Sequence, residues 1–352
     1  MAYAAISKPS LYFDSKIYLG SSSAVTVTGL GFQPDWVWVK DRDNGNNHVL
    51  VDVVRGAGKF LQSNLSNAEV NNSSQSISAF TSDGFTTGTA NPANESASTT
   101  KGFISWNWKA GNSAGSSNSD GSITSTVSVN TTAGFSILKW TGDSSASATV
   151  GHGLGTTPAV IITKELNGGD YWHVWHKDLT NPNNLFLNTS HAQTAPSDGT
   201  LSNVGSSTFG FQGATNVVAV NENGIDNIGY CFAEKKGYSK FGKYTGNGNA
   251  DGTFVYTGFK PAWVMTKEIS NTSSWDMHDN KRDSNNVCNK YLLAEAADVE
   301  GTTDILDFLS NGFKFRSSNG DRNESGASYI YMAFAEEPLV ANVGQSIPAT
   351  AR

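Results

Sequence analysis

The histidines are the residues of this chain best suited to chemistry, because imidazole binds metals and exchanges protons near neutral pH. Two of them, His173 and His176, lie in the run Trp-His-Val-Trp-His-Lys-Asp and could form a metal site with Asp178. On a β-strand, however, side chains three positions apart point to opposite faces. We therefore expect a half-buried strand rich in tryptophan at this place, and no metal site. The remaining histidines are His48, His152, His191 and His278.

A calcium loop is the second candidate. Residues 41–45 read Asp-Arg-Asp-Asn-Gly, and Asp52 follows eleven positions after Asp41. The glycine comes one position too early, and an aspartate stands where such loops use a bidentate glutamate. A polar hairpin turn built on Asn44-Gly45 explains the same residues without an ion, and we favour the turn.

The sequence gives little support for acid–base or nucleophilic catalysis. Asp276, His278 and Asp279 lie close together, but a general acid or base needs a positioned partner that the sequence does not supply. Cys231 lies inside an apolar strand and is expected to be buried and inert, whereas Cys288 lies in a polar, exposed stretch without a base. No serine-hydrolase elbow, P-loop or dinucleotide fingerprint occurs. The sequence therefore predicts no catalytic residue and no enzyme.

The tryptophans permit a different kind of site. Aromatic rings can stack against sugars, but most of the nine tryptophans lie inside apolar strands, where core packing is the better explanation. Trp172, Trp175 and Trp275 lie beside polar loops. We therefore predict these three as the ligand-contacting residues, if the protein binds a ligand through its tryptophans.

The same series of elements occurs three times along the chain, which is the feature that organises it. A proline followed six positions later by a lysine, with an apolar run between them, is found in residues 31–40, 155–164 and 258–267. The segments before these runs end at Gly20, Gly142 and Gly246, and aromatic strands close the copies at residues 103–109, 228–234 and 330–336.

Each copy has about 100 residues and contains short apolar runs separated by Gly, Asn, Asp or Ser clusters, a spacing typical of antiparallel sandwiches. We predict an all-β protein with three tandem β-sandwich repeats of the jelly-roll or concanavalin-like type. The Pro-to-Lys strands are apolar at both parities, so both of their faces should be covered. Gly31 and Gly258 are expected to have positive φ before these strands. The best helical pattern is residues 289–297, enough for one or two turns.

The predicted boundaries follow from these markers and from composition. Residues 111–133 are rich in Gly, Ser, Asn and Thr and are interpreted as a linker or surface excursion, and the two ends are interpreted as tails that need a partner to hold them. The predicted segments are an N-terminal tail 1–10, repeats at 11–110, 134–236 and 237–337, the linker 111–133, and a C-terminal tail 338–352.

Composition narrows the class of protein. The 352 residues carry a formal charge of −7, with 38% hydrophobic and only 16% charged residues. The sequence has no basic run, which argues against nucleic-acid binding. It also has no apolar run of about 18 residues, the length that a helix needs to span a membrane. We see no signal peptide, and two cysteines without metal-site spacing make neither a disulfide framework nor a zinc site. No metal or cofactor is predicted.

Six segments form a distinctive set, namely residues 1–13, 31–40, 53–56, 105–111, 230–242 and 348–352. Taken together, they resemble a family of virion structural proteins from marine tailed bacteriophages. The resemblance implies a tail-fibre-like protein with concanavalin-like repeats, made in the bacterial cytoplasm and placed on the virion exterior. It supplies no catalytic residues.

Three functions compete at this stage. The first is a tail fibre or receptor-binding component in host attachment, with other virion proteins as partners and a host glycan or receptor as ligand. A homo-oligomer, preferably a trimer, is expected by association with such parts. The rivals are a capsid decoration or head-fibre protein, and a polysaccharide depolymerase or lectin-like module. A depolymerase would need two carboxylates about 5–10 Å apart in a groove.

Overall fold

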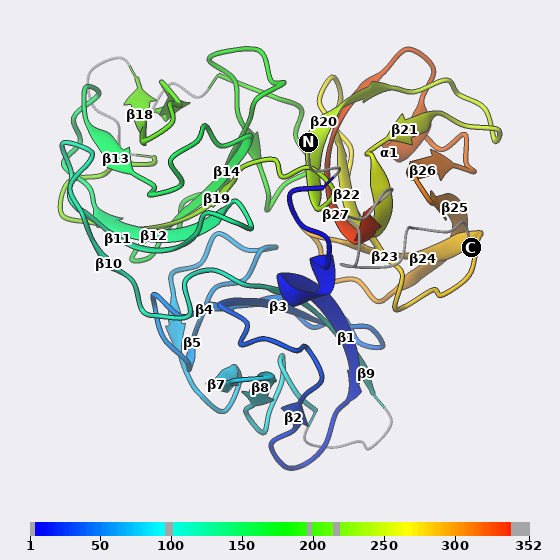
Figure 1. Cartoon of the computed structure of the whole chain (residues 1–352), viewed down its shortest axis with the longest axis horizontal. Helices are drawn as coiled ribbons and strands as arrows, with labels where there is room; N and C mark the ends of the chain where they lie inside the picture. Colours follow the sequence, from blue (N-terminus) through cyan, green and yellow to red (C-terminus); the bar gives the residue numbers. More distant parts are fainter. Residues whose placement is uncertain (1–3, 96–100, 196–198, 214–218, 339–352) are drawn as a thin grey trace.

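The chain folds as three lobes around a common centre (Figure 1). The computed structural model describes residues 4–95, 101–195, 199–213 and 219–338, and most regular structure in this part of the chain is β-strand. All pairings between the named strands, β1 to β27, are antiparallel. The predicted all-β fold is confirmed. We call the lobe from β1 to β9 unit 1, that from β10 to β19 unit 2, and that from β20 to β27 unit 3.

Unit 1 has an inner sheet in the order β1-β9-β3-β4 and an outer sheet in the order β2-β8-β7, with a small ribbon of β5 and β6 beside them. Its elements are the 3₁₀ turn η1 (Pro9–Leu11), β1 (Phe13–Leu19), β2 (Thr26–Val27), β3 (Trp36–Asp41), β4 (Val49–Asp52), β5 (Lys59–Phe60), β6 (Val70–Asn71), β7 (Ile77–Thr81), β8 (Gly84–Thr87) and β9 (Gly102–Trp108).

Unit 2 repeats this order in its inner sheet, β10-β11-β12-β19-β14-β15-β16, and in its outer sheet, β13-β18-β17. Its elements are β10 (Ser116–Asn118), β11 (Ser125–Asn130), β12 (Phe135–Thr141), β13 (Thr149–Gly151), β14 (Val160–Glu165), β15 (His173–His176), β16 (Leu185–Phe186), β17 (Thr200–Ser202), β18 (Thr208–Gln212) and β19 (Asp226–Phe232).

In unit 3 the inner and outer strands form one sheet, β20-β27-β22-β23-β24-β25-β26-β21. Its elements are β20 (Ser239–Thr245), β21 (Phe254–Tyr256), β22 (Phe259–Glu268), β23 (Trp275–Asp279), β24 (Cys288–Leu293), β25 (Gly301–Leu309), β26 (Gly312–Phe315), the short helix α1 (Gly320–Asn323) and β27 (Ser328–Pro338).

Strand register makes positions in the three units directly comparable. The first tryptophan of β3, Trp36, pairs with Trp108 on one side and Asp52 on the other. The corresponding pairs are Val160 with Phe232 and His176, and Trp263 with Phe334 and Asp279. Asp52, His176 and Asp279 are therefore equivalent positions, and the same counting gives Trp106, Tyr230 and Met332 as another equivalent set.

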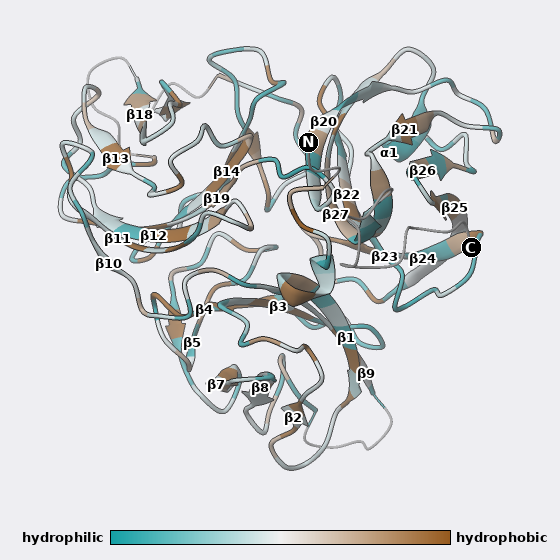
Figure 2. Cartoon of the chain, in the orientation of Figure 1, coloured by the Kyte–Doolittle hydropathy of each residue, from teal (hydrophilic) through white to brown (hydrophobic). Residues whose placement is uncertain are grey.

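The central strands β3, β14 and β22 are covered on both faces. This was predicted from the apolar residues at both odd and even positions of each strand. All six residues of β3 and of β14, and all ten of β22, are buried. Trp36 and Trp38 face a core shared by all three units, whereas Val37 and Val39 face the separate core of unit 1. Figure 2 shows hydrophobic residues on strands of all three lobes, the outer strands included. One shared core and one core within each unit hold the molecule together.

Three predicted segments differ from the structure. Residues 111–133 are not a linker, because β10 and β11 extend the inner sheet of unit 2. The segment is rich in Gly, Ser and Asn, but Thr126, Val127 and Val129 of β11 favour a strand. Residues 289–297 begin as β24, since pairing of Leu292 with Met277 overrides the local helical pattern. Of the predicted N-terminal tail, residues 4–6 are held against the rest of the chain, with Ala4 and Ile6 buried and Ala5 N donating to Lys236 O. The C-terminal segment beyond Pro338 lies outside the described residues.

The glycines before the Pro-to-Lys strands have the predicted backbone conformation. Gly31 has φ 74° and Gly258 has φ 81°. A Cβ at either position would meet no atom closer than 3.6 Å, so backbone strain alone decides the effect of a substitution. We expect Gly31→Val and Gly258→Val each to lower the free energy of unfolding by about 1–2 kcal/mol, measured by urea denaturation. Gly169→Val is the control, because Gly169 has open space and no positive φ; equal losses in all three variants would contradict this account.

Candidate functional site

The residues that the sequence nominates for chemistry lie mostly where two units meet. We call these contacts the 1–2, 2–3 and 3–1 junctions, after the units that form them. All three border the shared core, which contains Trp172 and Trp275 together with Tyr230. The junctions follow one plan, and the differences between them are informative.

A ring nitrogen crosses each junction to a main-chain carbonyl. His48, Trp172 and Trp275 are equivalent, because each lies four residues before Asp52, His176 and Asp279 respectively. The Nδ1 atom of His48 accepts from Trp38 Nε1 at 2.8 Å, so its Nε2 carries the proton and acts as the donor. The three bonds run from His48 Nε2 to Leu293 O (3.0 Å), from Trp172 Nε1 to Gln62 O (2.9 Å), and from Trp275 Nε1 to Phe186 O (3.0 Å).

A second set of bonds links the same units through the main chain alone. In each case an amide beyond the inner strands of one unit donates to the residue that follows the central strand of the next. The bonds are Glu69 N to Leu166 O (2.8 Å), Gln193 N to Ile269 O (3.1 Å), and Glu300 N to Arg42 O (2.9 Å). The three units therefore contact one another in a closed cycle, as the subunits of a threefold ring do.

The tryptophans predicted to contact a ligand are used differently. Trp172 and Trp275 are 0% and 1% exposed, and their rings lie in the shared core. The prediction that they contact a ligand is wrong for these two. Their sequence neighbours are polar, but the rings themselves point into the shared core. Trp175 is half-buried and packs against the separate core of unit 2. The structure does not bring the three together as a stacking surface.

A buried charged cluster lies at the 1–2 junction. Arg55 Nε donates to Asp52, its Nη2 donates to Leu50 O at 2.7 Å, and its Nη1 lies 3.3 Å from Glu69. From the other unit, Tyr230 Oη donates to Asp52 at 2.8 Å. Burial opposes the charge on Arg55, but the carboxylates of Asp52 and Glu69 raise its pKa above the ordinary value. The cluster is fully paired and has no open position for a ligand.

The 3–1 junction repeats this cluster with different chemistry opposite. Arg282 Nε donates to Asp279, its Nη2 donates to Met277 O at 2.8 Å, and its Nη1 lies 3.4 Å from Glu300. Here Trp106 Nε1, in the position of Tyr230, donates to Asp279 at 3.1 Å. The predicted acid–base residue Asp279 is thus held in a structural ion pair.

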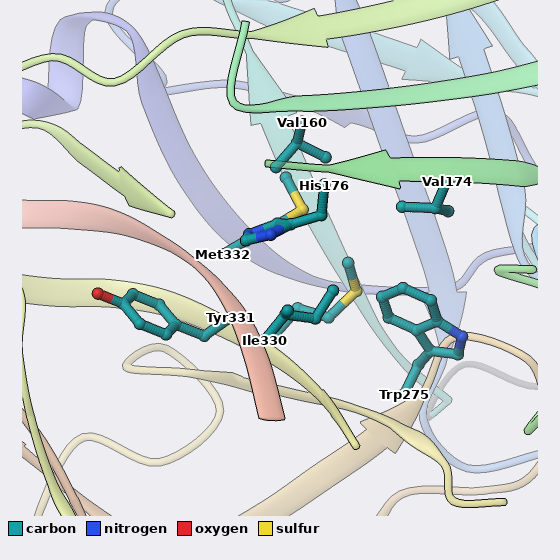
Figure 3. A pocket seen from close by; sticks show the side chains of 8 residues that line it. Val160, Val174, His176, Trp275, Ile330, Tyr331 and Met332 are labelled. Carbon is teal, nitrogen blue, oxygen red and sulfur yellow. The ribbon is translucent and has the colours of Figure 1, made fainter. Parts of the chain in front are cut away.

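The 2–3 junction has lost every charge of this cluster. Its equivalent positions carry His176, Leu179 and Gln193 in place of the aspartate, arginine and glutamate, and Met332 in place of the aromatic donor. A cavity of about 10 Å³ remains there, lined by His176, Met332 and apolar neighbours (Figure 3). A volume of that size holds about one water molecule. The replacement leaves no buried charge without a partner, and it makes no ligand site.

The structure also decides between the turn and the calcium loop predicted at residues 41–45. Asp41 accepts from the main-chain amides of Asp43 and Asn44 and from the side-chain amides of Asn44 and Asn46, at 2.7–3.0 Å. Asp52 is engaged by Arg55, so the turn explains residues 41–45 and the calcium alternative does not. No group of three or more His, Cys, Asp or Glu residues in the described ranges could hold a metal ion.

The histidine and cysteine predictions have mixed outcomes. His173 faces Asn184 inside unit 2 and His176 faces the 2–3 junction, so the two do not converge, although both are buried where a half-buried strand was predicted. Cys231 is buried as predicted, and burial raises the pKa of its thiol. Cys288 is 1% exposed, so the prediction of an exposed thiol is wrong.

Asp276 and His278 lie on the opposite face of β23 from Asp279, inside unit 3. Arg322 Nη2 donates to Asp276 at 2.6 Å. Burial raises the pKa of Asp276 to about 7, against the opposing effect of Arg322, and lowers the pKa of His278 well below its ordinary value. Both side chains are fully buried, so no substrate can reach this pair from solvent.

Two further patterns in the sequence mark residues with structural roles. An aspartate followed three positions later by arginine occurs at 52–55 and again at 279–282, and both pairs are the junction clusters. An Asn-Glu dipeptide occurs once per unit, and its asparagine is buried each time, at Asn94, Asn221 and Asn323. Either signal, read against the repeats, would have indicated structural roles for charged and polar residues.

Comparison with known proteins adds the family and little else. No curated protein and no solved structure matches the chain. Within the described residues, no helix has the length and apolar character needed to cross a bilayer. A family model matches residues 8–338, and the chain therefore belongs to the family described as Domain of unknown function (DUF7483).

Proposed function

We propose that this chain is a surface structural protein of a bacteriophage virion and acts in host attachment, as a tail fibre or receptor-binding component. The observation that carries the proposal is the closed cycle of junctions, in which three equivalent sets of contacts join three lobes. A single chain thereby forms a body with the threefold arrangement of contacts that trimeric attachment proteins form from separate subunits. The resemblance of the sequence to virion structural proteins supports the same assignment.

The chemistry of the nominated residues also favours a structural or binding role. Asp52, Asp279, His48 and the two buried tryptophans are all engaged in contacts between units. Residues committed in this way hold the lobes in place and cannot at the same time serve a substrate. Association with further copies of the chain, as a trimer, stays a prediction.

Capsid decoration is the second candidate, because a threefold body also fits a threefold position on a shell. In that case the protein binds other virion proteins and needs no host ligand. Immunogold labelling of intact phage particles, with an antibody to this protein, separates the two. We expect label on the tail; label over the head would assign decoration, and particles without label would overturn the virion location.

A further inference from the structure

Unit 1 contains a surface recess that no part of the fold requires. It has a volume of about 320 Å³, at the lower end of the range typical of small-molecule sites. It is formed by four separate segments of the unit, one of which includes Phe60 of β5. Figure 1 shows where β5 lies in the unit. Its lining residues are Asn46, Asn47, Phe60, Gln62, Val70, Gln75, Asn91 and Pro92.

The polar side of the recess consists of carboxamide side chains. Four of these five amides use one end to hold their own loop. The bonds are Asn46 Nδ2 to Asp41 (2.7 Å), Asn64 Nδ2 to Asn47 Oδ1 (2.7 Å), Asn72 Nδ2 to Gln75 Oε1 (3.0 Å), and Asn91 Nδ2 to Glu95 (3.3 Å).

Two of these amides have polar atoms without a hydrogen-bond partner among the described residues. One is Asn91 Oδ1, which is buried. The other is the side-chain amide of Gln62, whose main-chain carbonyl alone is engaged, by Trp172 and by the main-chain amide of Leu65. A buried acceptor without a partner is costly and is normally satisfied by water or a ligand.

Val70 and Pro92 form the accessible apolar side of the recess, and Phe60 also lines it but is only 2% exposed. An amide presents one acceptor and two donors, so a set of amides can match neighbouring hydroxyl groups that both donate and accept. A small apolar surface opposite them suits the C–H face of a sugar ring. All the lining residues are uncharged, which suits a neutral ligand.

Other ligand classes fit less well. No arginine or lysine lines the recess, so a phosphate or carboxylate has no ion-pair partner there. Phe60 is only 2% exposed, so no aromatic face is available for a nucleobase to stack on. The lining also has no carboxylate, so it lacks the acid pair of a glycoside hydrolase.

The equivalent places in the other units are filled. In unit 2 the positions of Asn47 and Gln62 are taken by Tyr171 and Phe186, whose rings contact each other with centroids 4.7 Å apart. In unit 3 the position of Phe60 is taken by Tyr291, which is covered by the guanidinium of Arg322 at 4.5 Å. The open, amide-lined recess is therefore a feature of unit 1 and does not follow from the repeated fold.

We propose that this recess binds a neutral saccharide unit, with the amides contacting its hydroxyl groups and the apolar side contacting its ring. The inference deepens the proposed attachment function, by naming a ligand class, but it concerns the purified protein and can be tested without the virion. Failure of saccharide binding and failure of virion labelling are separate results.

The test is saturation-transfer difference NMR on the full chain with glucose, galactose, mannose, N-acetylglucosamine and their disaccharides. We expect transfer to at least one neutral sugar, and about tenfold weaker binding in Gln62→Met, which removes the amide and keeps the side-chain length. Val70→Trp is the second variant, because it fills the recess and leaves all five amides in place. Gln212→Met, at an exposed glutamine of unit 2, is the matched control and should bind as the wild type does.

Three outcomes would overturn the proposal. One is the absence of transfer to any neutral sugar at the highest soluble concentration. Another is binding that survives both Gln62→Met and Val70→Trp, which would place the ligand elsewhere. The third is preferential binding of glucuronate, adenosine or triglycine, used as comparison ligands, which would assign a different ligand class to the recess.

Discussion

Removing the arginine at one junction, by Arg55→Leu, is expected to lower the free energy of unfolding by about 3–5 kcal/mol. The substitution leaves Asp52 buried at 0% exposure without its cationic partner, and it leaves Glu69 without one of its ion pairs. An uncompensated buried charge is among the largest single-residue effects on stability. Urea denaturation followed by tryptophan fluorescence measures the loss, since four tryptophans of unit 1 lie in the shared core.

The 2–3 junction supplies the control for this experiment within the same chain. There the aspartate, arginine, glutamate and aromatic donor are replaced together by His176, Leu179, Gln193 and Met332. Transferring this set to the 1–2 junction, as Asp52→His, Arg55→Leu, Glu69→Gln and Tyr230→Met, removes the charge together with its partners. We expect the fourfold variant to be more stable than Arg55→Leu alone, because replacing a complete buried ion cluster is far less costly than breaking one.

An exposed ion pair gives the second comparison. Lys240 lies 3.1 Å from Glu234, with both side chains partly exposed. Lys240→Met should change stability by less than about 1 kcal/mol. If Arg55→Leu proved no more harmful than this surface change, the junction cluster would not be a major source of stability.

How much of this structure could be predicted from the sequence depends on how far apart along the chain the interacting residues are. The parity of residues 36–39 predicted a strand buried on both faces, because alternation is a local property of the chain. The same pattern cannot say that Trp36 and Trp38 face two other units while Val37 and Val39 face their own. Contacts such as Tyr230 with Asp52 join residues 178 positions apart, and no local pattern contains them.

The candidate sites illustrate the same limit. Trp172 and Trp275 stood beside polar loops and were predicted to be accessible, but the neighbouring unit covers both. No local pattern marks the recess of unit 1, because its amides come from four separate places in the chain that each resemble an ordinary loop. Asparagine is so frequent in this chain that only convergence in space distinguishes the ones that form a site.

Acid should destabilise this protein steeply, because several histidines are buried in their neutral form. Burial lowers the pKa of His48 and His173 to about 3 and that of His176 to about 4. In the unfolded chain a histidine titrates near pH 6.5. Between pH 6.5 and these lower values the unfolded state binds more protons, so stability falls as the pH falls, by about 1.4 kcal/mol per pH unit for each such histidine.

Buried carboxyls act in the opposite direction, since burial raises the pKa of Asp35, Glu295 and Asp276. Burial raises the pKa of Asp276 to about 7, so the folded state takes up a proton there before the unfolded state does. This stabilises the fold as the pH falls from about 7 toward the ordinary aspartate value of about 3.9. Burial also lowers the pKa of His278 well below its ordinary value, and these four histidines outweigh the carboxyls. We therefore expect the free energy of unfolding to decline through the range from pH 6 to pH 4.

A single variant separates the contribution of the 2–3 junction from the rest. In His176→Gln the slope of unfolding free energy against pH should be smaller than in the wild type by about one proton, or about 1.4 kcal/mol per pH unit near pH 5. His191→Gln is the matched control, since His191 is exposed and should keep the wild-type slope. Urea denaturation at a series of pH values gives both slopes. A wild-type slope in His176→Gln would mean that this imidazole takes up its proton equally in the folded and unfolded states, and the junction would then be open enough to hydrate a charge. A reduced slope would instead mean that His176 stays neutral in the folded state, and that charging the junction between units 2 and 3 is part of how acid destabilises this fold.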